Sequence, residues 1–318
     1  MKQLLFFFVL LISLSIASQD FSKIKDVTDT YPGLLTAQKL AEKINTDFSS
    51  DEDKVKAIYS WMTKNIRYDL EEFYNPTRKE IRFSYQTEAE KEQKLLEFKN
   101  KIVSETLSTR KAVCEGFAQT FSKVCDLLNI ENEVIPGYVR TTSYHIGKPL
   151  PQPNHAWNAV KLDNNWIYID ATWGAGTENN GKWYRKFNSY YFNIPKNKYF
   201  KTHFPDESIW VLRVGRMEKN DFYNQPIFMH EFLKSDVELI SPTSGTLSKN
   251  KEGKIALMLK NLKPHQSVHV GFLGSPYAER IPIEKVGDNS LLEITPPQNS
   301  KHLFLLIDKE VAIQFLIE

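Results

Sequence analysis

Apolar residues recur at helical spacing in the segment that follows Ser50. Asp53, three residues after Ser50, completes a pattern that resembles a capping box, and the run of acidic residues favours a helix N-terminus. We therefore predict a helix that ends near Asn65, preceded by a short lead-in over residues 21–48. The buried stripe of this helix is expected to comprise Val55, Ile58, Trp61 and Met62.

A second helical stripe lies in KAVCEGFAQTFSKVCDLL, residues 111–128, with Cys114 at its head. After Cys114 the apolar positions are three or one residues apart, which matches one face of an α-helix. The positions are Phe117, Ala118, Phe121, Val124, Cys125 and Leu128, with Leu127 widening the stripe. Residues 71–110 are highly charged, and EAEKEQKLLEFKNK within them is typical of an exposed helix in a solvated connection.

Alternation of apolar and polar residues predicts strands further along the chain. Residues 131–138 are expected to form one strand, and residues 155–162 and 165–170 a β-hairpin around the turn Asp163-Asn164. Three glycines at 174, 176 and 181 indicate a loop after the hairpin, and aromatic residues dominate 183–210.

The pattern changes again from about Asp236. Short alternating segments separated by Pro, Gly, Asp and Asn predict an all-β sandwich of roughly 80 residues. The segments are KIALMLKNL, SVHVGFL, RIPIEKV, SLLEIT, HLFLLI and VAIQFLIE. The predicted organisation is therefore a first domain over 19–214, a linker over 215–235 and a β-sandwich over 236–318.

Residues 1–18 (MKQLLFFFVLLISLSIAS) have the form of a secretory signal peptide: an early lysine, an apolar run and small residues before a polar pair. A membrane anchor is the alternative, but the apolar run is shorter than the ~20 residues that span a bilayer. No later stretch is apolar enough to cross a membrane. We expect export to the periplasm, the cell surface or the medium.

The overall charge of the chain adds little to these predictions. The chain has 41 basic and 39 acidic residues, so nothing indicates nucleic acid or an anionic membrane as a partner. Aromatic residues make up 13% of the chain, which suits a packed core or a groove lined with rings.

The two cysteines are eleven residues apart in the predicted helix. Eleven helical residues extend ~16 Å, whereas a disulfide needs Cα atoms within ~7 Å. Cys114 and Cys125 are therefore not expected to pair. Cys125 lies in the apolar stripe and is expected to be a buried core thiol. Cys114 is left as a structural thiol or as a nucleophile, and a helix N-terminus lowers the pKa of a thiol.

His155 and Asp170 are the best candidates for a base and its partner. In a hairpin with the turn at 163–164, Trp157 faces Asp170 and His155 faces Thr172. All four side chains then point to one face, and His155 and Asp170 are diagonal neighbours ~7–8 Å apart at the backbone. An imidazole and a carboxylate can hydrogen-bond across that gap. The alternative is a packed histidine and an aspartate that serves a turn.

Three blocks, AVCEGFAQTF, NHAWNAV and YIDATWGAG, in this order resemble the transglutaminase-like superfamily, whose fold is papain-like. The resemblance implies an α+β domain in which a helix bearing Cys114 packs on an antiparallel sheet. It further implies Cys114 as nucleophile, His155 as general base and acid, and Asp170 as the residue that orients His155. The later stretch YYFNIPKNKYFKTHFPDESIWVL is similar to the kyphoscoliosis-peptidase-like branch, members of which carry a C-terminal immunoglobulin-like domain.

The function implied is a secreted cysteine enzyme that acts on amide bonds of a protein or peptide through a thioester. Hydrolysis is favoured over cross-linking, because the sequence has no EF-hand-like loop of spaced acids for the calcium of animal transglutaminases. A protein-glutamine transglutaminase and a non-catalytic binding or scaffolding protein are the alternatives. The β-domain could bind a surface partner, and the oligomeric state stays open.

Neither a metal nor a cofactor is expected. His203, in the family-like motif HFP, is interpreted as structural. His265 and His269 would face one side of a strand, but two ligands are too few for a metal site. The Cys114 backbone N–H is a natural oxyanion donor and the second donor is open, while Gly116 leaves room for a close approach.

Overall fold

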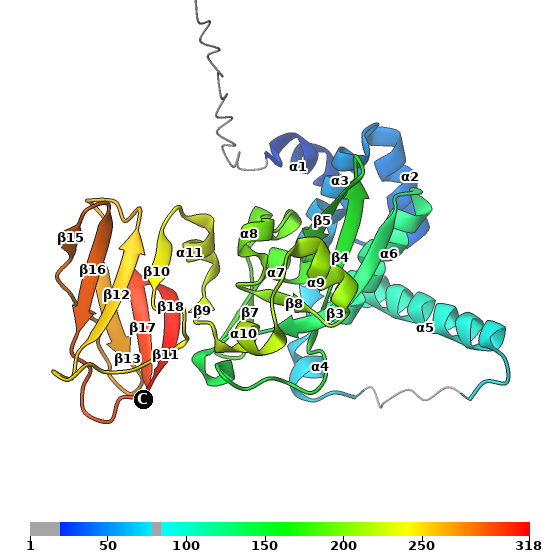
Figure 1. The fold of residues 1–318 in the computed structure, drawn as a ribbon. Coiled ribbons are helices and arrows are strands. Elements are labelled where there is room, and N and C mark those ends of the chain that lie inside the picture. The colour runs from blue at the N-terminus through cyan, green and yellow to red at the C-terminus, as the bar shows by residue number, and fades with distance from the viewer. Residues whose placement is uncertain (1–19, 78–83) are drawn as a thin grey trace, which may run out of the picture.

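The computed structural model describes residues 20–77 and 84–318, so the predicted signal peptide lies outside the described residues. Figure 1 shows two parts, a mixed helix-and-sheet part and a part made mainly of strands that ends at the C-terminus. None of the helices in these two ranges combines the length and apolar character needed to span a membrane.

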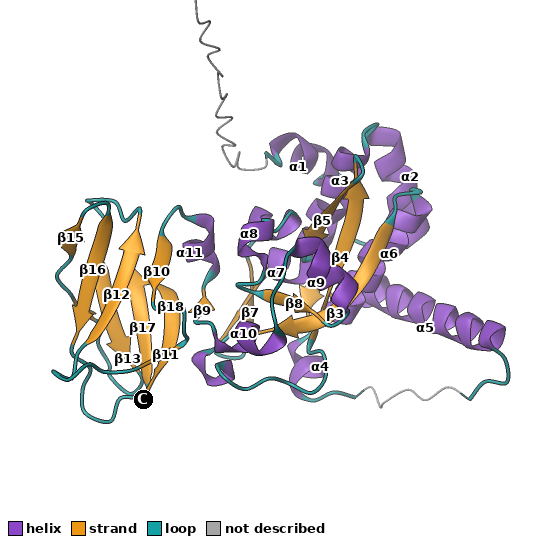
Figure 2. Cartoon of the chain, viewed as in Figure 1, coloured by secondary structure: helices purple, strands orange, loops and turns teal. Residues whose placement is uncertain are grey.

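The first part is built from helices around one antiparallel sheet (Figure 2). Its helices are α1 (Ser22–Thr28), α2 (Ala37–Asp47), α3 (Asp51–Asn65), α4 (Leu70–Tyr74), α5 (Glu88–Thr109), α6 (Cys114–Leu127), α7 (Ala171–Ala175), α8 (Lys196–Tyr199) and α9 (Ser208–Val214), with the short turns η1 (Ser143–His145) and η2 (Ser189–Phe192). Its strands are β1 (Arg67–Tyr68), β2 (Lys111–Ala112), β3 (Asn132–Val139), β4 (His155–Leu162), β5 (Asn165–Ile169), β6 (Gly176–Asn179), β7 (Lys182–Arg185) and β8 (His203–Pro205).

Helix α3 begins and ends where the sequence predicts. The Ser50 side chain accepts a hydrogen bond from the Asp53 N–H at 3.1 Å, and the predicted stripe is buried. Burial extends to other faces, because Ala57, Tyr59 and Thr63 are also buried. The stretch predicted as a simple lead-in instead forms α1 and α2, which pack on α3. The core thus surrounds α3.

Helix α5 confirms the predicted helix in the charged segment, but it is not only a solvated connection. Figure 1 shows its N-terminal part extending away from the domain. Its last turns bury four residues against the rest of the domain, and α5 packs on α6. These are Ile102, Val103, Thr106 and Leu107.

The central sheet has the strand order β5-β4-β3-β8 and is antiparallel throughout. The predicted hairpin register is confirmed as far as the pair Asn158 and Ile169. Asp163 and Asn164 both have positive φ, at 47° and 63°, as the two-residue turns that join hairpin strands require.

The register prediction fails beyond Ile169. Asp170 leaves the sheet and caps α7, so it does not face Trp157 across the hairpin, and Thr172 does not face His155. The predicted glycine-rich loop is also different, because it consists of α7 and the antiparallel pair β6 and β7. The Asp170 side chain satisfies two backbone N–H groups at the start of α7, which stabilises a helix there in place of further strand.

Each face of the sheet is covered by a different part of the chain. Helix α6 packs on β4 and β3, and the Asn158 amide donates to the Ala118 carbonyl of α6 at 3.0 Å. On the other side, Trp157 and Tyr168 pack with Tyr191 and Tyr199 from the aromatic segment. That segment therefore closes the domain core.

The second part is a sandwich of two sheets. Its strands are β10 (Glu238–Ser241), β11 (Thr246–Leu247), β12 (Ile255–Lys260), β13 (Val268–Phe272), β14 (Glu279–Arg280), β15 (Glu284–Val286), β16 (Asn289–Ile294), β17 (His302–Ile307) and β18 (Glu310–Ile317). One sheet has the order β10-β12-β16-β15 and the other β11-β18-β17-β13-β14. A separate apolar core lies between them, which confirms the all-β prediction from alternation. His265 lies in a turn and not on the strand of His269, so the predicted common face is wrong.

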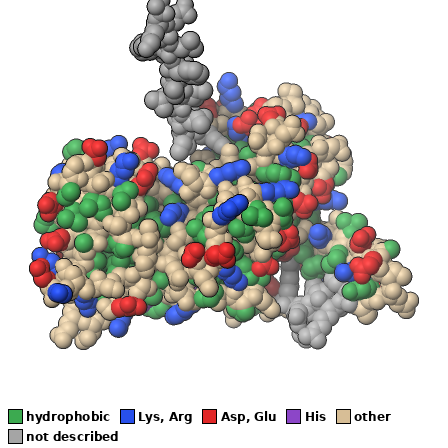
Figure 3. Space-filling model, viewed as in Figure 1, with side chains coloured by type: hydrophobic (Ala, Val, Ile, Leu, Met, Phe, Trp, Pro, Cys, Tyr) green, Lys and Arg blue, Asp and Glu red, His purple; other side chains and the backbone are tan. Residues whose placement is uncertain are grey.

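The segment between the two parts carries α10 (Lys219–Asn224), β9 (Ile227–Phe228) and α11 (His230–Lys234). Strand β9 pairs with β18, so this segment adds to the second sheet. Direct contacts also join the parts: the Ser143 N–H donates to Gln314 at 3.0 Å, and its hydroxyl contacts His302 Nδ1 at 2.8 Å. Acidic and basic side chains are mixed over the face in Figure 3.

Candidate active site

Cys114 is the first residue of α6. The N-cap residue, Val113, has no side-chain cap bond, so the helix begins without a side chain covering its first N–H groups. These groups carry the positive end of the helix dipole and favour an anion at this position. A Cβ on Gly116 would lie 2.6 Å from both Thr106 Oγ1 and Ala112 Cβ. Gly116 therefore allows α5 and β2 to pack closely against the start of α6.

The two cysteines are both free, as the helical spacing predicts. Cys125 is fully buried, and burial raises the pKa of its thiol well above the usual value. Such a thiol stays protonated and is inert. Cys114 is only partly buried and is the cysteine that a reagent or substrate can reach.

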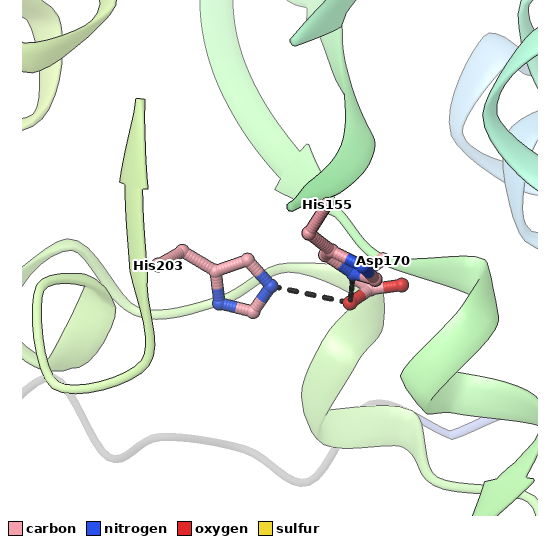
Figure 4. Close-up of side chains that lie close together, drawn as sticks. All are labelled: His155, Asp170 and His203. Carbon is pink, nitrogen blue, oxygen red and sulfur yellow. Dashed lines mark hydrogen bonds and ion pairs between the residues drawn. The ribbon is translucent and has the colours of Figure 1, made fainter. Parts of the chain in front are cut away.

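Asp170 is a fully buried carboxylate that accepts four hydrogen bonds. Its Oδ1 accepts from the N–H groups of Thr172 at 2.8 Å and Trp173 at 3.0 Å. Its Oδ2 contacts the Nε2 atoms of His155 at 2.8 Å and His203 at 3.1 Å, as the dashed lines in Figure 4 mark. These four bonds use the full acceptor capacity of an ionised carboxylate.

Burial alone would raise the pKa of Asp170, but the charge of His155 and the bonds from both histidines lower it below its ordinary value. The pKa of His155 moves the other way. Burial acts to lower it, yet the charge and hydrogen bond of Asp170, followed by the influence of Cys114, raise it to about 10. The pair is therefore an imidazolium and a carboxylate at neutral pH.

His203 is buried among aromatic rings and contacts the same carboxylate oxygen. Burial, with the charge of His155, lowers its pKa against the raising effect of Asp170, so the ring is neutral. A neutral ring carries one N–H, and an ionised carboxylate only accepts. We therefore assign the proton to Nε2, and the Thr202 hydroxyl donates to Nδ1 at 2.7 Å.

Cys114 acts directly on the His155 ring: after the charge and hydrogen bond of Asp170, a side-chain hydrogen bond with Cys114 also raises the pKa of His155. Tyr68 belongs to the same neighbourhood: burial and then the charges of Cys114 and Asp170 raise the pKa of its hydroxyl. The structure thus joins His155, Asp170 and His203 by hydrogen bonds, with Cys114 and Tyr68 beside them.

The two histidines and Asp170 are also the kind of side chains that bind a metal ion, and their ligand atoms lie within 4.8 Å of one another. The geometry favours hydrogen bonds. Both Nε2 atoms contact one oxygen, at 2.8 and 3.1 Å, whereas ligands ~2.1 Å from a tetrahedral ion are spaced by roughly 3.4 Å.

The sequence does not predict two residues of this neighbourhood as site residues. It favours a structural role for His203, and the motif HFP is the signal that points to its place here. Tyr68 reaches the site because β1 pairs with β2 in parallel, which puts Tyr68 beside Ala112, two residues before Cys114. Strands of two residues leave no usable pattern in the sequence.

The class of protein follows from the comparison with known families. Residues 38–171 match the transglutaminase-like superfamily, and this range includes Cys114, His155 and Asp170. This part of the chain is a transglutaminase-like domain, as its resemblance predicts.

The chain is similar to kyphoscoliosis peptidase of Homo sapiens, with 25% identity over 259 residues that cover 79% of this chain and 35% of that protein. It is 20% identical to the Lim and transglutaminase domain protein ltd-1 of Caenorhabditis elegans over 240 residues, 70% of this chain and 30% of that protein. A crystal structure described as a TGase is 21% identical and covers 58% of this chain and 40% of its own, with a TM-score of 0.30. The chain spans about a third of the length of these curated relatives, and the first of them supports the kyphoscoliosis-peptidase-like branch.

His203 offers a test of the hydrogen-bonded cluster. We expect His203→Ala to lower kcat/KM about 10- to 100-fold, because it removes a hydrogen bond to a buried charge. Losing this donor raises the pKa of Asp170, so the acid limb of the pH–rate profile should move to higher pH. His203→Gln places an amide N–H near the same oxygen and should restore the profile. A profile unchanged in His203→Ala would leave the residue with a packing role only.

Proposed function

We propose that this protein is a thiol enzyme that acts on amide bonds of a protein or peptide. In this proposal Cys114 is the nucleophile, His155 the general base and acid, and Asp170 the residue that orients His155. The observation that carries the proposal is the buried His155–Asp170 pair, with its raised His155 pKa, beside a free thiol at a helix N-terminus. An imidazolium next to such a thiol favours the thiolate.

The reaction follows from these roles. The Cys114 sulfur forms a bond to the carbonyl carbon, and the carbonyl electron pair moves to oxygen. When this intermediate collapses, the C–N bond breaks and the His155 imidazolium gives its proton to the leaving amine. A thioester on Cys114 remains. Water or an amine then attacks the thioester, His155 takes its proton, and the thiolate leaves.

The negative oxygen formed in the first step needs hydrogen-bond donors. The Cys114 N–H lies in the uncapped first turn of α6 and is one candidate. The Tyr68 hydroxyl is the second, because its pKa responds to the charge of Cys114. A phenol held protonated by its surroundings can donate to an oxyanion at neutral pH.

Water is the second nucleophile that we favour, which makes the protein a peptidase or amidase. The similarity to kyphoscoliosis peptidase supports hydrolysis, while the name of the Caenorhabditis relative keeps amine transfer as the alternative. Export through the predicted signal peptide and an immunoglobulin-like character of the second part belong to the same proposal.

The rival from another class is a binding or scaffolding protein without turnover. To separate the three possibilities, the purified protein would be incubated with a glutamine-containing peptide library, with and without a labelled primary amine, and the products read by mass spectrometry. We expect cleaved or deamidated peptides that are absent with Cys114→Ala. Label incorporated into the peptides would establish amine transfer instead, and unchanged peptides together with a Cys114 as unreactive as a free thiol would contradict the enzyme proposal.

A further inference from the structure

A surface cavity of about 380 Å³ lies beside the ribbon of β1 and β2, where α3 and α5 end. Five of its lining residues are cations and none is a carboxylate. The cations come from separate parts of the chain and are Lys64, Arg67, Arg110, Lys111 and Arg185. The protein has nearly equal numbers of basic and acidic residues, yet all the charged side chains that line this cavity are positive.

Two of these cations have partners within the fold. Lys64 forms an ion pair with Asp29 at 2.8 Å, and Arg185 donates to the carbonyl oxygens of Ile66, at 3.0 Å, and Thr63. The C-terminal ends of α3 and α5 add about half a negative charge each. Asp29 and the two helix ends together therefore offset about two of the five positive charges.

The other three cations are uncompensated. The side chains of Arg67, Arg110 and Lys111 form no hydrogen bond or ion pair with any residue in the described ranges 20–77 and 84–318. Two of them also act on Arg185: burial, followed by the charges of Arg110 and Arg67, lowers the pKa of Arg185. Like charges held around a cavity destabilise the fold unless an anion lies between them.

Arg110 adds an independent observation. It follows α5 in the left-handed conformation, with φ 55° and ψ 33°. Glycine usually occupies this position after a helix, because a side chain disfavours it. An arginine here suits the backbone poorly, but it directs a guanidinium to the cavity that it lines.

We propose that this cavity binds a tetrahedral oxyanion, phosphate or sulfate, either free or as an ester. Arginine side chains form paired hydrogen bonds with such oxyanions, and three arginines with two lysines match a group that carries two negative charges. The volume of the cavity is close to the lower end for small-molecule sites, which suits a small anion or the anionic end of a larger molecule.

The site is separate from the proposed nucleophile but close to it in the chain. Arg67 pairs with Lys111 across the ribbon, and Tyr68 pairs with Ala112. Because side chains alternate along a strand, Arg67 and Lys111 leave the ribbon on the face opposite Tyr68. An anion bound there would fix the ribbon that leads to Cys114 without entering the reaction.

The test is a titration of the full chain with inorganic phosphate and with tripolyphosphate, at constant ionic strength set with chloride. We expect saturable heat in calorimetry and a rise in Tm. Phenyl phosphate, a phosphate monoester, is the third probe. If it binds as tightly as phosphate, the site accepts esters. If only the inorganic ions bind, the site is restricted to free anions. Absence of saturable binding for all three probes would overturn the proposal.

Arg110→Gly is the informative variant, because glycine suits the left-handed conformation. It should keep or raise the Tm of the free protein while weakening phosphate binding at least tenfold. Lys309→Gly is the matched control, since Lys309 is an exposed cation with φ 70° in the β-sandwich, and it should bind phosphate normally. Lys111→Gln gives a second variant that leaves the backbone unchanged. Equal binding by Arg110→Gly, Lys111→Gln and the unmodified protein would refute the site, as would equal weakening by Lys309→Gly.

Discussion

Replacing Cys114 with alanine should reduce turnover by on the order of 10⁶-fold, because the other thiol of the described residues, Cys125, is fully buried and protonated and cannot take its place. The thermal stability should stay close to that of the unmodified protein, since Cys114 is only partly buried. Turnover would be measured on a peptide that the unmodified protein cleaves or deamidates, and Tm would be measured by calorimetry.

Cys125→Ala is the matched control for Cys114→Ala. Cys125 is fully buried, so removing its sulfur leaves a small cavity and should destabilise the fold by about 1 kcal/mol. Turnover per folded molecule should not change. Iodoacetamide at pH 6 should modify Cys114 and not Cys125, and His155→Ala should slow that modification. Turnover retained in Cys114→Ala would disprove its assignment as nucleophile.

Local patterns were sufficient to predict the elements that carry the site. The spacing of apolar residues after Cys114 predicts α6, and the Asp-Asn turn with alternating flanks predicts the register of β4 and β5. Both signals depend on neighbours in the sequence. The prediction that Cys125 belongs to the core rests on the same stripe and is confirmed by its burial.

Contacts between distant segments could not be predicted in this way. His203 is 33 residues from Asp170 in the chain, and its hydrogen bond depends on how β8 pairs with β3. Tyr68 approaches Cys114 only because α5 returns the chain to β2. The alternation of residues 165–170 predicts that Asp170 is the last residue of the strand, whereas its side chain caps α7 by accepting hydrogen bonds from two backbone N–H groups.

The cationic cavity also depends on contacts between segments that are distant in the sequence. Its five charges come from the ends of two helices, from the short strands β1 and β2, and from β7, far along the chain. The numbers of basic and acidic residues in the whole sequence are nearly equal, but the acidic residues that balance these five cations lie outside the cavity. Net charge therefore says little about local electrostatics in a chain of this kind.

Asp170→Asn should lower turnover about 10⁴-fold, the size of the loss when the orienting carboxylate of a catalytic triad loses its charge. The amide cannot sustain the imidazolium, so burial then lowers the pKa of His155 from about 10 to below its ordinary value. The neutral ring no longer favours the Cys114 thiolate at pH 6. Alkylation of Cys114 should consequently slow at this pH.

The same variant should change stability in a pH-dependent way. The pKa of Asp170 is lowered in the folded state, so its contribution is present above ~4 and is lost as the pH falls through its folded pKa. The pKa of His155 is raised, so its contribution is complete below ~6.5 and declines as the pH rises toward its folded pKa of about 10. The unmodified protein should therefore exceed Asp170→Asn in stability most clearly between about pH 4 and 6.5, by on the order of 3 kcal/mol.

Urea unfolding across this pH range measures the difference directly. Asp206→Asn is the matched control, because Asp206 is an exposed carboxylate that accepts a hydrogen bond from Tyr138 at 2.6 Å. It should lose little turnover and show no maximum between pH 4 and 6.5. If the stability difference for Asp170→Asn were constant from pH 4 to 10, then His155 and Asp170 would not be a charged pair. The imidazolium that the proposed reaction requires would then be absent, and His155 could act only as a neutral base.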